Sequence, residues 1–116
     1  MLRLIQKDIE KAKNQLKPWS ENFMIYFCKP KNWDYYYLEN INGYFVLYYL
    51  DERGGKNIIS KTQNYDFLKY KCFELLVQFC SYKYVDYILK NESNPTSNQL
   101  ELIREKQNEF MKIIAP

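Results

Sequence analysis

Short apolar runs bounded by polar and turn residues mark the middle of the chain as a series of β-strands. Four short runs containing aromatic or β-branched residues lie at 23–28, 33–38, 44–50 and 57–61. Asn42-Gly43 and Gly54-Gly55 separate the last three runs, and residues of these types tolerate the positive φ of tight hairpin turns. Because the connections are too short for crossovers, we predict a four-stranded antiparallel meander.

Helical periodicity predicts one helix before this sheet and another at the end of the chain. Residues 2–17 carry apolar side chains at helical spacing, and Pro18 ends that segment. The last helix follows a polar linker in which Asn94 is the predicted N-cap and Pro95 takes the first helical position, where a missing N–H costs nothing. Each helix has one apolar stripe, which is typical of a helix that packs on a core.

A longer helix is predicted to begin near Asp66, with Asn64 or Thr62 as its N-cap. Its apolar positions cover much of its circumference and comprise Phe67, Leu68, Tyr70, Cys72, Phe73, Leu75, Leu76, Phe79, Cys80, Tyr84, Tyr87 and Ile88. We therefore interpret residues 1–116 as one α+β domain. It consists of an N-terminal helix, the antiparallel meander and two C-terminal helices packed on the sheet.

The composition is that of a folded protein with many tyrosines. Apolar residues make up 47% of the chain and aromatic residues 18%, which excludes a disordered protein. The 12 tyrosines suit a binding surface because each has an apolar body and a polar tip, although an AT-rich genome would also produce them. The net charge of +3 is spread along the chain, without the basic run that marks a nucleic-acid site.

The residues of common catalytic and cofactor sites are missing from the sequence. The chain has no histidine, which removes the commonest general base and every histidine-containing metal site. It also has no glycine-rich phosphate loop. We therefore expect no cofactor, no metal and no enzymatic activity. Acid–base chemistry by Asp51, Glu52 and Asp66 stays open, but their positions in a turn and at a helix start favour structural roles.

The cysteines and the start of the chain indicate a reducing compartment. Cys28, Cys72 and Cys80 are an odd number without metal-binding spacing, and we expect them to be buried, reduced thiols. The first residues are charged and amphipathic, unlike a signal peptide, and no segment reaches the ~18 apolar residues of a membrane span. We therefore expect a cytoplasmic protein with no membrane partner.

The stretch from Tyr44 to Tyr70 combines an aromatic strand with a helix entered through a Tyr-Asp-Phe-Leu-Lys-Tyr string. The strand runs into Glu52-Arg53-Gly54, and Lys61-Thr62 follows a short spacer. This order resembles the immunity protein 63 family, one of the families of bacterial immunity proteins from polymorphic toxin systems. The positions that match the structural motif of the family are Gly54, Asp66, Leu68, Tyr70 and Phe73. The resemblance covers about a quarter of the chain.

The resemblance implies a protein that binds and neutralises the C-terminal domain of a cognate toxin, such as one delivered in contact-dependent growth inhibition. Such an inhibitor needs aromatic anchors ringed by polar groups rather than a catalytic centre. The candidate toxin-binding residues are Glu39, Tyr48, Tyr49, Asp51, Glu52 and Arg53. The favoured interpretation is an ion pair of Arg53 with Glu52, or with a carboxylate elsewhere, that fixes the hairpin. Outward contact of the pair with the toxin is the alternative.

Further alternatives stay open at this point. The toxin could be a nuclease, and acidic groups would then face its basic groove. Those groups would be Glu39, Asp51 and Glu52 at one end of the sheet, or Glu101, Glu105 and Glu109 along the last helix. A nucleic-acid-binding module with an aromatic sheet face is a second function class. A homo-oligomer formed through exposed tyrosines or an unpaired edge strand is a third.

Overall fold

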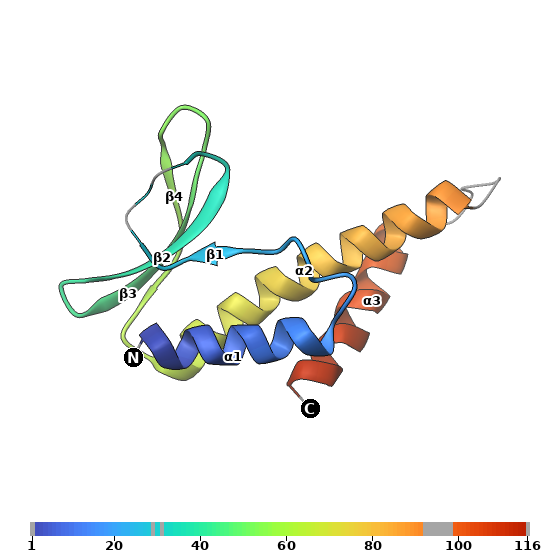
Figure 1. Ribbon diagram of the computed structural model, residues 1–116, viewed down its shortest axis with the longest axis horizontal. Coiled ribbons are helices and arrows are strands. Elements are labelled where there is room, and N and C mark those ends of the chain that lie inside the picture. The colour runs from blue at the N-terminus through green and yellow to red at the C-terminus, as the bar shows by residue number, and fades with distance from the viewer. Residues whose placement is uncertain (1, 29, 31, 92–98, 116) are drawn as a thin grey trace. The chain divides into compact units, whose positions relative to one another are not determined.

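Three helices and four strands follow one another in an α+β order (Figure 1). In the computed structural model of the protein, residues 2–28, 30, 32–91 and 99–115 are described. The elements are α1 (Leu2–Gln15), β1 (Ile25–Tyr26), β2 (Tyr35–Ile41), β3 (Tyr44–Leu50), β4 (Lys56–Thr62), α2 (Tyr65–Asn91) and α3 (Gln99–Ile114). The predicted order of one helix, four strands and two helices is therefore confirmed.

The sheet is mixed, so the prediction of a purely antiparallel meander is wrong at its first strand. The strand order is β1-β2-β3-β4, and β2, β3 and β4 pair antiparallel as predicted. β1 instead pairs parallel to β2, with Ile25 opposite Tyr36. β1 has only two residues and is therefore only about 7 Å long. After β1 the chain has to return over only that distance before it enters β2, which runs in the same direction. No crossover helix is needed over such a distance.

The two predicted hairpin turns use the backbone conformations that their residues favour. Asn42 has φ 52° and Gly43 has φ 83°, and they connect β2 to β3. Gly54, at φ 80°, lies in the turn between β3 and β4. Positive φ at these positions is what tight hairpin connections require, which is why the sequence located both turns.

A β-bulge interrupts the pairing of β3 with β4. Ile58 lies opposite Tyr48 and Ser60 lies opposite Leu47, so Ile59 has no partner residue on β3. Because alternate strand residues point to opposite faces, this extra residue shifts the alternation along the rest of β4. Lys61 consequently lies opposite Val46, on the same face of the sheet as Tyr48 and Ile58.

The chain divides into two compact units, which we describe separately. The first, the sheet unit, comprises Met1–Lys7 and Met24–Lys71. Its fully buried apolar side chains include Ile5, Leu38, Leu47, Tyr37, Tyr48 and Leu68. The second, the helical unit, comprises Asp8–Phe23 and Cys72–Pro116. The interpretation of the whole chain as one domain stays a prediction.

Aromatic contacts are prominent in the helical unit. The Trp19 ring lies edge-on to the rings of Tyr84 and Tyr87, with centroids 5.1 Å and 5.7 Å apart. The Phe23 ring packs on Phe79 at 5.4 Å, and Tyr84 also meets Phe110 at 6.5 Å. Trp19 and Phe23 belong to the segment after α1, so these rings attach that segment to α2 within the unit.

The cysteine prediction is confirmed at two positions and wrong at the third. Cys72 and Cys80 are buried free thiols, and burial raises the pKa of each to about 12. Cys28 is a free cysteine as expected but is exposed. It lies two residues after the end of β1 at Tyr26, because the strand does not continue to residue 28. The side chain therefore lies beyond the paired strand.

The ends of the first two helices agree with the local sequence signals. The Asn64 side-chain oxygen accepts a hydrogen bond from the Phe67 N–H at 3.0 Å, which makes Asn64 the N-cap of α2. The Thr62 hydroxyl accepts from the Asn64 N–H at 3.0 Å and orders the preceding turn. α1 ends at Gln15, shortly before Pro18. The predicted cap Asn94 and Pro95 of the last helix lie outside the described residues.

The buried stripe of α2 is narrower than predicted. Leu68, Cys72, Leu76 and Cys80 are completely buried, as their spacing indicates. Phe67, Tyr70 and Tyr87 were expected to widen the stripe, but all three are exposed. An apolar residue on a helix needs a neighbouring element to cover it, and periodicity alone does not reveal that element. None of the helices within the described ranges is long and apolar enough to cross a membrane.

Replacing Asn64 with Ala is expected to lower the free energy of unfolding by about 1 kcal/mol, because the first turn of α2 loses a side-chain acceptor. Urea denaturation followed by circular dichroism measures this change. Gln63→Ala is the matched control, since Gln63 is the neighbouring exposed residue, and it is expected to shift stability by less than about 0.5 kcal/mol. Equal effects of the two substitutions would contradict the capping role of Asn64.

Candidate binding groove on the sheet

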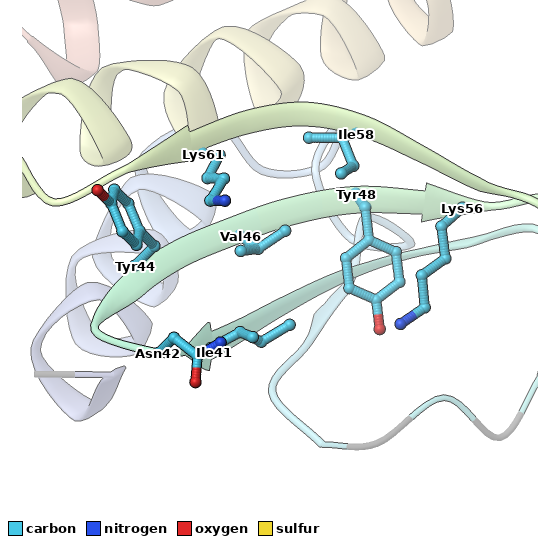
Figure 2. A pocket seen from close by; sticks show the side chains of 8 residues that line it. All are labelled: Ile41, Asn42, Tyr44, Val46, Tyr48, Lys56, Ile58 and Lys61. Atoms are coloured by element: carbon cyan, nitrogen blue, oxygen red, sulfur yellow. The ribbon is translucent and has the colours of Figure 1, made fainter.

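A groove of about 420 Å³ lies on one face of the sheet unit (Figure 2). Its walls come from the end of β2, from the hairpin that follows, and from β3 and β4. The lining residues are Ile41, Asn42, Tyr44, Val46, Tyr48, Lys56, Ile58 and Lys61. We call this side of the sheet the groove face and the other side the opposite face.

The groove has a buried floor and exposed apolar walls. Val46 and Tyr48 on β3 are buried and form the floor, and Figure 2 shows Val46 between Tyr44 and Tyr48. The walls remain accessible, with 40% exposure for Ile41, 37% for Tyr44 and 62% for Ile58. Ile41 pairs with Tyr44 at one end of the groove, and Ile58 lies opposite Tyr48 further along the sheet. Exposed apolar side chains that line one groove are typical of a surface that is covered by a partner.

Two lysines from β4 lie over tyrosine rings of the groove. The Lys56 ammonium is 5.0 Å from the centroid of the Tyr48 ring, and the Lys61 ammonium is 4.9 Å from that of Tyr44. Both distances are within the range of cation–π interactions, about 6 Å. The bulge at Ile59 is what brings Lys61 to this face. The groove therefore carries two positive charges and no carboxylate among its lining residues.

The base of the groove is held by a hydrogen bond between a buried tyrosine and a carboxylate. The Tyr48 hydroxyl donates to Oε2 of Glu39, which lies on β2 opposite Val46. Burial, followed by this hydrogen bond, raises the pKa of Tyr48 well above its ordinary value. Glu39 is thus engaged inside the sheet unit instead of pointing at a partner.

The other end of the groove face is covered by the segment that leads into β2. The Tyr37 ring stacks on Tyr48 with centroids 5.7 Å apart, and Tyr26 packs against this pair. The Tyr37 hydroxyl donates to the Asn32 carbonyl at 2.8 Å and accepts from the Asn32 N–H at 3.1 Å. Tyr37 thus supports the buried Tyr48 from the β2 side of the sheet.

The six candidate toxin-binding residues do not form one site. Tyr48 and Glu39 bond to each other on the groove face. Tyr49 lies on the opposite face and donates to Asp34 at 3.0 Å, a hydrogen bond that raises the pKa of Tyr49. The remaining three, Asp51, Glu52 and Arg53, lie in the turn between β3 and β4. Neighbours in sequence are therefore separated by the alternation of strand faces.

Asp51, rather than an ion pair, orders the turn between β3 and β4. Its carboxylate accepts from the Arg53 N–H at 2.9 Å, from the Gly55 N–H at 2.8 Å and from the Asn57 side-chain amide at 3.2 Å. The hydrogen bond from Gly55, followed by that from Asn57, lowers the pKa of Asp51. The expected ion pair between Glu52 and Arg53 is not formed in the described hairpin. That prediction is wrong because the shorter Asp51 side chain takes the turn's N–H groups.

The residues of the family motif have mainly structural positions. Gly54 supplies the positive φ of the hairpin, and Asp66 lies in the first turn of α2, where its charge favours the helix. Leu68 and Phe73 are buried. Tyr70 is exposed, so it is not part of the core.

The second acidic set, on α3, is partly neutralised within its own helix. Glu101, Glu105 and Glu109 are exposed. Glu109 forms an ion pair with Lys106 at 2.7 Å, and this hydrogen bond raises the pKa of the lysine. The Lys106 ammonium also lies 4.0 Å from the centroid of the Tyr84 ring. Lys106 thus lowers the negative charge that α3 presents to solvent.

Sequence reasoning missed most of the residues that line the groove. The alternation of Tyr44, Val46 and Tyr48 was visible, and so was the position of Ile58 on a return strand. The place of Lys61 was not visible, because a bulge without glycine leaves no clear sequence signal.

Comparisons with family models, with curated proteins and with solved structures gave no match. The family resemblance therefore stays a prediction.

Asp51→Asn is expected to reduce the dependence of stability on acid pH. A carboxylate whose pKa is lower in the folded state stabilises the fold above its unfolded pKa, near 3.8, and this contribution is lost as the pH falls through the folded pKa. Asn keeps an acceptor oxygen but does not titrate. Urea unfolding midpoints at pH 7 and at about pH 3 are therefore expected to differ less in the variant than in the wild type.

Glu52→Gln is the control for that experiment, because it removes the adjacent carboxylate, which takes no part in the hydrogen bonds of Asp51. It is expected to keep the pH dependence of the wild type. If Asp51→Asn and Glu52→Gln flattened the acid profile equally, a general charge effect would explain the result and the role of Asp51 would be refuted.

Tyr48→Phe is expected to lower the free energy of unfolding by about 1 to 2 kcal/mol, because Glu39 loses its hydroxyl donor. Tyr44→Phe is the matched control on the same strand and face, and its effect is expected to stay within about 0.5 kcal/mol. Chemical denaturation of both variants gives the comparison. If Tyr48→Phe left the free energy of unfolding unchanged, water would replace the Tyr48 hydroxyl as donor to Glu39 at no cost in free energy. The prediction would then be refuted.

Proposed function

We propose that the protein is an immunity protein, a stoichiometric binder that neutralises a cognate toxin domain. It acts in the cytoplasm, as in contact-dependent growth inhibition systems, and needs no cofactor. The observation that carries the proposal is the groove on the sheet, which Ile58, 62% exposed, lines together with Ile41 and Tyr44. The resemblance of the adjoining hairpin and helix start to an immunity protein family supports the same conclusion.

The groove has the composition of a protein-binding surface. Protein interfaces combine an apolar centre, where most of the binding energy arises, with a polar rim. Here Ile41, Val46 and Ile58 provide the centre, and Lys56 and Lys61 provide charges at the rim. Glu39 and Tyr48 serve as the support beneath this surface rather than as contact residues.

A nucleic-acid-binding sheet is the alternative class, and the groove favours it less. Sheets that bind RNA present bare aromatic faces on which bases stack. Here Tyr48 is buried, and the rings of Tyr48 and Tyr44 lie beneath the ammonium groups of Lys56 and Lys61. A base would have to displace these lysines to stack.

The test is co-expression with the protein encoded directly upstream. We expect a stable one-to-one complex and rescue of cells from that protein. Ile58→Ala is expected to weaken the complex about tenfold, because it removes the most exposed apolar wall of the groove. Calorimetric titration measures the affinity. Ile113→Ala on α3, at another exposed isoleucine, is the matched control and is expected to bind like the wild type.

Three results would count against the proposal or its docking surface. A wild-type protein that forms no complex and gives no rescue would exclude the immunity function. Binding to single-stranded RNA that weakens steeply with salt would instead support the nucleic-acid class. An affinity that Ile58→Ala and Ile113→Ala reduce equally would move the docking surface away from the groove.

A further inference from the structure

We propose that the groove receives an acidic side chain of the toxin domain, carried on a segment whose neighbouring residues are apolar. This inference rests on the proposed function and adds the chemistry of the partner. It follows from the charge of the groove, the position of Lys61, the shape of the sheet edge and the size of the groove.

The charge of the groove calls for an anion. Lys56 and Lys61 line it, and none of the other lining residues is acidic. The Glu39 carboxylate, on the same face, accepts the hydrogen bond of the Tyr48 hydroxyl and does not line the groove. Neither lysine forms an ion pair within the described chain, and the only partner of each ammonium there is a tyrosine ring. A carboxylate from outside would give either ammonium group a charge-assisted hydrogen bond and would be attracted by the other over a longer distance.

The position of Lys61 depends on a specific irregularity of the sheet. In a regular ladder, Ile59 would pair with Leu47 and Lys61 would point to the opposite face. The bulge pairs Ser60 with Leu47 instead and turns Lys61 into the groove. Bulges commonly re-aim a side chain at a functional surface. The result is a cation at each end of the groove on β4, with Ile58 between them (Figure 2).

The outer edge of β4 is unsuited to strand pairing, so we expect the partner to bind on the groove face of the sheet. β4 pairs only with β3 among the described strands, so its outer edge could accept another strand. The bulge at Ile59 and the two lysines, however, are the features by which proteins prevent such edge pairing. Addition of a strand from a second copy of this chain is therefore disfavoured. The accessible apolar walls lie on the face instead.

The volume of the groove limits what enters it. About 420 Å³ is near the lower end of ligand-pocket sizes and accommodates a few side chains rather than a folded domain. The apolar walls Ile41 and Ile58 suit aliphatic or aromatic neighbours of the acidic residue. A phosphate backbone would satisfy the lysines but leave these walls uncovered. The combination therefore favours an acidic segment of a protein over a nucleic acid.

The first experiment replaces the charges without changing side-chain length greatly. In the complex with the protein encoded upstream, Lys56→Gln and Lys61→Gln are each expected to weaken binding about fivefold and to reduce its salt dependence. Lys112→Gln, at an exposed lysine of α3, is the matched control and is expected to change the affinity less than twofold, about the scatter of such titrations. Calorimetric titration at two salt concentrations measures both properties.

The second experiment locates the partner segment directly. A photo-crosslinking p-benzoylphenylalanine in place of Ile58 is expected to attach to the partner, and mass spectrometry is expected to find Asp or Glu within the attached peptide. The same group in place of Glu52, at the hairpin turn, is the control position and is expected not to attach. Changing the identified carboxylate of the partner to Lys is expected to abolish binding to the wild type and to restore it with Lys61→Glu.

The outcomes separate this inference from the proposed function. If the wild type forms the complex and rescues cells but both lysine variants bind like Lys112→Gln, the immunity function stands and the acidic-segment inference is overturned. Attachment from position 52 and not from position 58 overturns it as well. If the wild type forms no complex, the proposed function fails, and this inference fails with it.

Discussion

The unpaired Ile59 in β4 is the constraint on which the groove of the sheet depends. One extra residue changes the face to which Lys61 points, while Lys56 and Ile58 before it keep theirs. The effect is large because side-chain direction in a strand alternates with every residue. The same bulge interrupts the edge of the sheet. One irregularity thus arranges a charged surface and protects the strand that bears it.

The hairpin before β4 fixes the register in which β4 pairs with β3. Asp51 accepts hydrogen bonds from two backbone N–H groups of the turn and from Asn57. A Cβ at Gly55 would lie 2.8 Å from the Asp51 carboxylate, so a larger residue at that position would displace the carboxylate from its hydrogen bonds. Because a turn sets the register of the strands that it joins, Asp51 and Gly55 determine where β4 begins its pairing with β3. The second unit of the chain is organised differently, through aromatic contacts around Trp19.

Features that depend on neighbouring residues were predictable from the sequence. Asn42-Gly43 and Gly54 identified both hairpins, and Asn64 identified the start of α2. Contacts between distant segments were not predictable. The parallel pairing of β1 depends on a return path that has no composition signal, and the exposure of Tyr70 depends on which elements cover α2. For the site, Tyr48 was predicted as a contact residue, but its burial and its bond to Glu39 became clear only when the register was known.

The contacts between lysines and tyrosines have a consequence for the entropy of association. A lysine side chain in solvent samples many rotamers, and ordering it on binding is costly. Lys56 and Lys61 already lie on the rings of Tyr48 and Tyr44 in the unbound chain. Much of their freedom is therefore lost during folding rather than at the moment of encounter. The protein presents its two cations preorganised, so a partner meets a surface that needs little rearrangement to bind.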